Sequence, residues 1–206
     1  MTAGEVLTHG AAQLGMEVGE DAQKKMLEYL TLLQKWNQVY SLTAVRQPER
    51  MVSNHLLDSL AVLPHLWPGR WLDVGSGAGL PGLVLALMRP DWAVTLLDSN
   101  SKKTGFMQQA AIELGLDNVT VCCARAESWH PVQKYDGIIS RAFASLADFT
   151  HLTRHLLHPA GKWAAMKGAP EAELECLPLG INVEQLIPLH VPGVDAARCL
   201  VILKSI

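Results

Sequence analysis

The spacing of apolar residues changes along the chain, and this change separates a helical region from an alternating one. In the first third, apolar residues recur every three or four positions, as at Met26, Leu30 and Leu33, which is typical of amphipathic helices. The helices expected there cover residues 6–14, 20–38 and 48–63. We therefore expect residues 1–65 to form a helical extension packed on a single globular unit, residues 66–206.

Beyond residue 66, short apolar runs alternate with helix-like segments, which predicts a mostly parallel sheet wrapped on both faces. The strands expected cover residues 70–74, 93–98, 118–123, 136–141 and 161–166, and the helices cover 80–88, 101–114, 146–158 and, more weakly, 170–177. The last two apolar segments, 183–191 and 199–204, are joined by the turn 192–195 and leave no room for a helix. They predict a hairpin, so the final strand runs antiparallel to its neighbour.

Residues 70–82 combine a short apolar strand with a glycine-rich turn. Gly75, Gly77 and Gly79 follow the strand at alternate positions, and an apolar, helix-like run comes next. Glycines at this spacing let the backbone bend tightly and let a flat ligand lie against it, because no Cβ intervenes. Residues 77–82 also satisfy the dinucleotide fingerprint G-x-G-x-x-G, although this match alone is weak.

Asp73 ends the strand that precedes the glycine turn, and its side chain is expected to point into the same crevice. A carboxylate there repels a pyrophosphate, whereas it can pair with the α-ammonium of S-adenosylmethionine, which carries no phosphate. S-adenosylmethionine is therefore favoured over NAD as the cofactor. The alternative is a glycine turn that only packs a helix on a strand.

Polar residues also follow the later strands, at the end of the sheet where ligands of such folds bind. Asp98 could accept hydrogen bonds from both ribose hydroxyls, and residues 126–127 could lie at the adenine or simply start a helix. Arg141 lies in an apolar stretch and needs a partner, either a core carboxylate or a ligand, because an unpaired buried charge is expensive. Lys167 is either a surface lysine or part of the site.

Composition narrows the partners and the location. The chain has 206 residues, of which 49% are hydrophobic and 18% charged, with no apolar run long enough for a membrane span and no secretion signal at its start. We therefore expect a cytoplasmic protein. The four cysteines show no C-x-x-C spacing, so no metal centre is expected. The net charge of −3 gives no overall basic field, so an RNA partner would have to be attracted locally.

Seven short motifs occur in a fixed order along nearly the whole chain. They are Trp36-Asn37, Leu42-Thr43, His55-Leu56-Leu57-Asp58-Ser59, residues 73–82, Leu97-Asp98-Ser99, residues 140–144 and Lys167-Gly168. This order resembles the bacterial 16S ribosomal RNA guanine-N7 methyltransferase family, also called glucose-inhibited division protein B. The resemblance implies a class I S-adenosylmethionine-dependent methyltransferase with a Rossmann-like, seven-stranded sheet, which methylates one guanine in the loop of helix 18.

The resemblance also implies roles for individual residues. The expected cofactor contacts, including those suggested by the strand ends, are Asp73, Gly75, Gly77, Gly79, Leu80, Asp98, Ala126, Glu127 and Arg141. Arg125 and Lys167 are expected near the reacting guanine. The expected RNA contacts are Asn37, Ser41, Arg46, His55, Lys102 and Lys103. The segment 36–43 fits an inter-helix corner capped by Asn37 and Thr43 equally well.

Guanine N7 has an in-plane lone pair and no proton, so its methylation requires no general base, and positioning is the main source of rate. We expect a monomer that acts on 16S ribosomal RNA or the small ribosomal subunit and binds no membrane. Two alternatives are a methyltransferase of a small molecule or protein, and a non-catalytic regulator that binds RNA or a nucleotide. The first would not need the helical extension, and the second would bind the cofactor without turnover.

Overall fold

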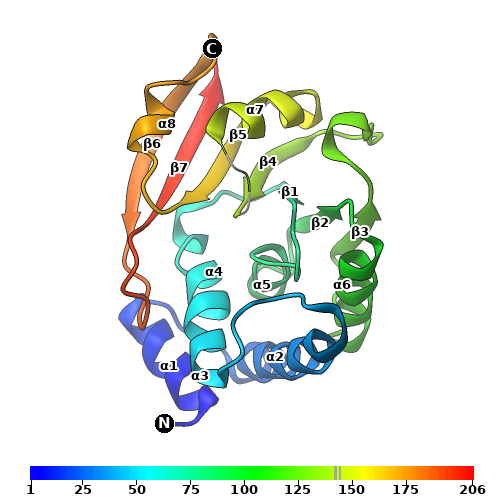
Figure 1. Cartoon of the computed structure of the whole chain (residues 1–206), viewed down its shortest axis with the longest axis vertical. Coiled ribbons are helices and arrows are strands. Elements are labelled where there is room, and N and C mark those ends of the chain that lie inside the picture. Colours follow the sequence, from blue (N-terminus) through cyan, green and yellow to red (C-terminus); the bar gives the residue numbers. More distant parts are fainter. Residues whose placement is uncertain (142, 144) are drawn as a thin grey trace.

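Seven strands form one mixed sheet in the order β3-β2-β1-β4-β5-β7-β6 (Figure 1). This computed structural model describes residues 1–141, 143 and 145–206, so Ala142 and Ala144 of the 140–144 motif lie outside the described residues. The strands are β1 (Arg70–Val74), β2 (Ala93–Asp98), β3 (Val119–Cys123), β4 (Tyr135–Ser140), β5 (Leu157–Lys167), β6 (Ile181–Leu189) and β7 (Arg198–Ser205). Strands β1 to β5 are parallel, and β7 is antiparallel to both β5 and β6. The predicted sheet with its terminal hairpin is confirmed.

Helices precede and connect these strands. They are α1 (Ala3–Gln13), α2 (Glu20–Tyr40), α3 (Pro48–Met51), α4 (Asp58–Leu60), α5 (Gly82–Met88), α6 (Ser101–Glu113), α7 (Leu146–Thr153) and α8 (Glu171–Leu174). A π-helical segment, Val52–Leu57, joins α3 to α4, and short 3-10 turns cover Leu63–His65, Ala126–Ser128 and Arg154–Leu156. Within the described residues, no helix is long and apolar enough to cross a membrane.

Successive strand residues point to opposite faces of the sheet, and each face has its own hydrophobic core. Leu96 of β2 and Ile202 of β7 share one core with α1, α2, α5 and α6. Leu97 and Val201, one position away in each strand, pack instead with Phe149 of α7. Figure 1 shows the first four helices gathered near α5, at a distance from α7. The helices of residues 1–65 are thus packed on the sheet's core, while the boundary at residue 65 stays a prediction.

The helix predicted over residues 146–158 is too long. Helix α7 ends at Thr153, a 3-10 turn follows, and β5 begins at Leu157, which pairs with Tyr135 of β4. Pro159 disfavours the α-helical conformation at His158, and the pairing of Leu157 with β4 places the end of the predicted helix in the sheet. The helix predicted over residues 170–177 is likewise reduced to the four residues of α8.

Close packing of α5 on the sheet depends on Gly82. A Cβ at this position would overlap with the side chain of Leu96 and lie 2.8 Å from Asp73 Oδ2. The Gly82→Ala variant is therefore expected to lower the free energy of unfolding by about 1–3 kcal/mol, as overpacked cores do. Urea unfolding followed by circular dichroism measures the change.

Gly105→Ala in α6 is the matched control, because the added Cβ there would meet no atom within 4 Å. This variant is expected to raise the free energy of unfolding by about 0.5–1 kcal/mol, since alanine favours the helix. If both substitutions changed the free energy of unfolding by the same amount, the close approach of α5 to the sheet at Gly82 would be contradicted.

Candidate cofactor and substrate site

The glycine turn after β1 is fixed to the neighbouring strand and leaves its backbone open. The N–H groups of Gly75 and Ser76 both donate to the carbonyl oxygen of Leu97, at 2.8 and 3.2 Å. Gly75, Gly77 and Gly79 have φ angles of 68°, 60° and 83°, which residues with a Cβ rarely adopt. At Gly75 an added Cβ would meet no atom within 4 Å. The turn therefore presents bare backbone to a space that a ligand can fill.

Asp73 lies beneath this turn and is fully buried. Its Oδ2 accepts a hydrogen bond from the N–H of Gly82 at 2.8 Å, while Oδ1 has no partner among the described residues. Burial raises the pKa of Asp73 to about 7, despite the hydrogen bond from Gly82. The charged carboxylate thus lacks one interaction that a nearby cation would supply.

Asp98 ends β2 and holds the other side of the turn. Its Oδ2 accepts a hydrogen bond from the N–H of Gly77 at 3.0 Å, and its Oδ1 accepts one from Asn100 at 2.9 Å. Lys103 Nζ lies 3.8 Å from Oδ2. A carboxylate can accept about four hydrogen bonds in all, so Asp98 keeps the capacity to bind a ligand's hydroxyls.

A first cavity of about 400 Å³ opens beside Asp98 and the glycine turn. It is lined by Val74, Gly75, Leu97, Asp98, Ser99, Lys103, Ala124, Arg125, Ala126, Glu127, Phe143 and Leu152. Its volume falls within the usual range for small-molecule sites. Of the predicted cofactor residues, Gly75, Asp98, Ala126 and Glu127 thus come together, whereas Asp73, Gly77, Gly79, Leu80 and Arg141 do not line this cavity.

Arg125 also lines the first cavity, although the family resemblance implies a place near the guanine. Its Nη1 lies 3.8 Å from Oε1 of Glu127, and both side chains are largely exposed. Glu127 belongs to a short 3-10 turn, Ala126–Ser128, and does not start a longer helix. The two side chains therefore form a weak ion pair at the cavity wall that is screened by solvent, and a ligand can displace it at little cost.

A second cavity, of about 420 Å³, adjoins the first at Phe143, which lines both. It is lined by Val45, Asn54, His55, Asp58, Arg141, Phe143, Met166, Lys167, Gly168 and Arg198. Arg141 directly follows β4 and Lys167 is the last residue of the neighbouring β5, whereas His55 and Asp58 come from the helical extension. The two predicted guanine residues are therefore separated, with Arg125 in the first cavity and Lys167 in the second.

A buried carboxylate, Asp58, is the partner that Arg141 requires. Arg141 Nη1 lies 3.4 Å from Oδ2 of Asp58 and also donates to the carbonyl oxygen of Asn54 at 3.1 Å. Arg198 Nε lies 3.1 Å from the other oxygen of Asp58. The ion-pair interpretation of Arg141 is thus confirmed. The sequence marked Asp58 as part of a motif but did not identify it as the partner of Arg141, and it did not mark Arg198 at all, because nothing local links residues so distant along the chain.

Lys167 is not a surface lysine. Only 11% of its side chain is exposed, and its Nζ lies 2.9 Å from Oε2 of Glu173. It also donates to the carbonyl oxygen of Phe143 at 3.0 Å. Glu173 in turn accepts a hydrogen bond from the N–H of Leu146 at 2.7 Å. These contacts hold the ammonium group in a fixed place at the cavity wall.

His55 is buried in the wall of the second cavity. Its Nε2 lies 3.0 Å from Thr43 Oγ1, and its Nδ1 has no partner among the described residues. Burial, aided by the charge of Arg141, lowers the pKa of His55 to about 4. The imidazole is therefore neutral throughout the physiological pH range.

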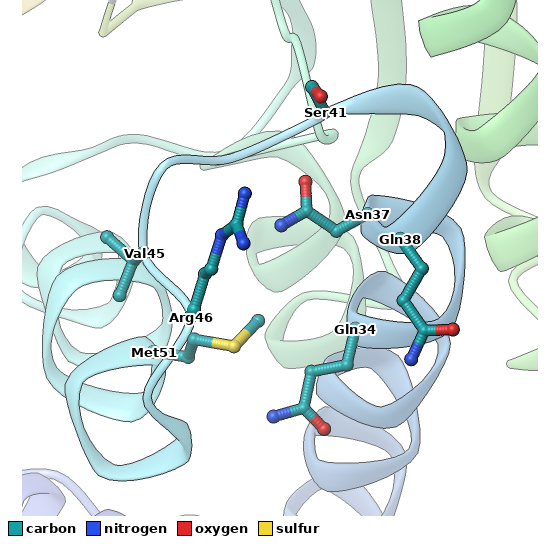
Figure 2. Close-up of a pocket in the computed structure, with 7 residues that line it drawn as sticks. All are labelled: Gln34, Asn37, Gln38, Ser41, Val45, Arg46 and Met51. Atoms are coloured by element: carbon teal, nitrogen blue, oxygen red, sulfur yellow. The ribbon is translucent and has the colours of Figure 1, made fainter.

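Asn37 forms the corner between α2 and α3, as one of the two interpretations predicts. Its side-chain amide accepts a hydrogen bond from the N–H of Thr43 at 2.8 Å and donates to the carbonyl oxygen of Thr43 at 2.9 Å. Asn37, Ser41 and Arg46 line a third cavity (Figure 2). Lys102 lies elsewhere, with its Nζ 5.9 Å from the ring centre of Tyr40.

The fold and the site define a class I S-adenosylmethionine-dependent methyltransferase. Two solved structures of such enzymes share the fold. One, from Aquifex aeolicus, is 21% identical with a TM-score of 0.57 and covers 78% of this chain and 94% of that chain. The other, from Thiobacillus denitrificans in complex with S-adenosyl-L-homocysteine, is 16% identical with a TM-score of 0.53 and covers 73% and 90%.

The particular family follows from more similar sequences. The family model described as GidB, rRNA small subunit methyltransferase G, matches residues 22–201. Ribosomal RNA small subunit methyltransferase G from Laribacter hongkongensis is 52% identical over 98% of both chains. The protein of the same name from Chromobacterium violaceum is 54% identical over 95% of this chain and 94% of its own. The chain belongs to the small subunit ribosomal RNA methyltransferase G family, and the predicted family and cofactor are confirmed.

The residues present fit S-adenosylmethionine. The open space at Gly75 admits a ligand against the backbone, and Asp98 offers a carboxylate in the cavity wall. Oδ1 of Asp73, which has no partner among the described residues, is a carboxylate oxygen beneath the turn that could pair with a ligand's ammonium group. Among the described residues, no group of three or more His, Cys, Asp or Glu side chains could hold a metal ion.

The raised pKa of Asp73 predicts a pH-dependent stability of the free protein. An unfolded aspartate has a pKa of about 3.9, so between pH 4 and pH 7 the folded state binds the additional proton. The contribution of Asp73 to the free energy of unfolding should fall through this window as pH rises, by up to about 1.4 kcal/mol per pH unit, whereas the lowered pKa of His55 acts in the opposite direction. Asp73→Asn should remove this dependence and raise the melting temperature at pH 8, as thermal unfolding at pH 5 and pH 8 would show.

The same variant should bind S-adenosylmethionine more weakly, by roughly 1.5–3 kcal/mol, because a charged interaction with the ammonium group is lost. Calorimetric titration at pH 8 measures this change. Unchanged cofactor affinity in a stabilised variant would show that Asp73 serves only to anchor α5.

Proposed function

We propose that this protein transfers a methyl group from S-adenosylmethionine to N7 of a guanine in the helix-18 loop of 16S ribosomal RNA, within the small subunit. The observation that carries the proposal is the pair of cavities that meet at Phe143. One has the residues of a nucleoside site, and the other has a rim of arginine and lysine. A cofactor and an RNA base can thus be held in neighbouring cavities that share one aromatic residue.

In the first cavity, this chain's residues would bind and orient the cofactor. The bare backbone of Gly75 lets the cofactor lie close to the sheet, and Asp98 accepts hydrogen bonds from its ribose hydroxyls. Ala126 and Glu127 lie where the adenine would be expected. When bound, the cofactor supplies an electrophilic methyl group on a positively charged sulfur.

In the second cavity, positive charge exceeds negative charge. Arg141, Lys167 and Arg198 contribute three cations, against the two carboxylates of Asp58 and Glu173, which leaves one net positive charge. About 29% of each arginine side chain is exposed, so each guanidinium retains N–H groups for a ligand. Asp58 contacts each guanidinium through one nitrogen, and the remaining N–H groups are of the kind that bind phosphate and purine acceptors.

The chemistry required of these residues is positioning. Guanine N7 carries a lone pair and no proton, so no side chain has to accept a proton in the step. His55, with a pKa near 4, is held neutral and hydrogen-bonded to Thr43, which suits a group that shapes the cavity. The acceleration of methyl transfer then comes from holding N7 in line with the methyl group in a site that excludes water.

Transfer of a radioactive methyl group from S-adenosylmethionine tests the proposed substrate. Purified protein is incubated with small subunits from a strain that lacks this gene, with large subunits, or with a small-molecule extract. We expect label in the RNA of the small subunits alone. Label in a small molecule or a protein would indicate the first alternative, and binding without transfer would indicate a regulator.

Arg125→Ala and Lys167→Ala serve as variants in this assay, with Lys134→Ala as a control at an exposed site. Both variants should lose RNA methylation more than cofactor affinity, because their cations are assigned to the guanine. A parallel loss of cofactor affinity would reassign that residue to the cofactor, and this outcome is of special interest for Arg125, given its place in the first cavity.

A pH series tests the absence of a general base. Single-turnover methylation at saturating cofactor and RNA should vary little between pH 6 and pH 9, since no side chain must lose a proton. His55→Gln should not alter the shape of this profile, even where it weakens docking of RNA, because His55 is neutral over the whole range. A tenfold rise per pH unit that disappears in the variant would establish a proton transfer and exclude unaided attack by N7.

A further inference from the structure

A third cavity, of about 350 Å³, lies between the last two turns of α2 and the connection to α3. It is lined by Gln34, Asn37, Gln38, Ser41, Val45, Arg46 and Met51. Figure 2 shows Arg46 and Met51 reaching towards α2 from one side, opposite the amide side chains of the helix. The cavity is therefore polar along α2, cationic at Arg46 and apolar at Met51.

Three of these polar side chains have no partner in the part of the chain that the structure describes. Among the described residues, Gln34, Gln38 and Arg46 make no side-chain hydrogen bond or ion pair. Asn37 differs, because its amide is fully engaged with the backbone of Thr43. Two free amides and one free guanidinium thus face a common space, while Asn37 keeps the surrounding loop in shape.

This set of groups matches one nucleotide. A glutamine amide presents a donor beside an acceptor, which is the pattern that reads the edge of a nucleobase. A guanidinium binds a phosphate through paired N–H groups. The thioether of Met51 provides an apolar, adaptable surface against which a base ring can lie.

The third cavity lies beside the proposed substrate site. Val45 lines both the second and the third cavities. Thr43, in the same connection, contacts His55 of the second cavity through its hydroxyl at 3.0 Å. A strand of RNA that leaves the second cavity would therefore reach the third along this connection.

We propose that the third cavity binds an unpaired nucleotide that flanks the target guanine, with its base edge on Gln34 and Gln38 and its phosphate on Arg46. This inference rests on the proposed function, because it takes the second cavity as the guanine site. Sequence-specific binding of RNA generally uses unstacked bases held in such pockets. Gln34 and Gln38 are then residues that determine which RNA loop is methylated.

The test compares wild type with the Gln34→Met/Gln38→Met double variant on small subunits assembled with each of the four bases at the positions flanking the target. Gln13→Met, which changes an exposed glutamine of α1, is the control. We expect wild type and the control to lose about 5- to 150-fold in kcat/KM when the flanking base is changed. The double variant should show similar kcat/KM values for all four bases. Its KM should be raised, while kcat and cofactor affinity are unchanged.

Arg46→Gln separates the phosphate contact from base reading. It should raise KM about equally for all four bases and reduce the dependence of binding on salt. The inference is overturned if the double variant keeps the wild-type preference among the four bases, or if wild type itself shows no preference. Absence of methylation by wild type would instead overturn the proposed function.

Discussion

Two carboxylates at the ends of adjacent parallel strands hold the glycine turn, and the rest of the site depends on them. Asp73 accepts the N–H of Gly82, at 2.8 Å, and Asp98 accepts that of Gly77, at 3.0 Å. The turn is thereby anchored at both sides, with Gly75 facing open space. Burial of Asp73 raises its pKa to about 7, so the charged form is disfavoured in the free protein and a bound cation would favour it.

The helical extension connects this turn to the substrate cavities. The hydroxyl of Tyr29 in α2 is buried and donates to the carbonyl oxygen of Ala78, within the turn, at 2.8 Å. At the other end of α2, Asn37 holds the corner that carries Thr43 to His55. One rigid helix thus supports both the cofactor side and the proposed RNA side. The sheet alone would not define the substrate, because part of the proposed RNA side comes from this helical extension.

Local patterns predicted the sheet, the hairpin, the glycine turn and the corner at Asn37, because each depends on residues close together in the sequence. Long-range partners could not be predicted in this way. Asp58 meets Arg141 across 83 positions and Arg198 across 140, and only the completed fold brings them together. The burial of Lys167 likewise depends on Glu173 of α8, a helix too short to have a clear periodic pattern. The roles assigned to individual site residues stay predictions.

The central claim is that a site built for positioning, without a general base, methylates an unprotonated ring nitrogen of guanine. Its most direct test is the identity of the product. Small subunits from a strain that lacks this gene are methylated by the purified protein with labelled S-adenosylmethionine, and the RNA is digested to nucleosides and separated. We predict that the label is recovered as 7-methylguanosine from the helix-18 loop. Recovery on an exocyclic amine, a ring carbon or a ribose would contradict the account.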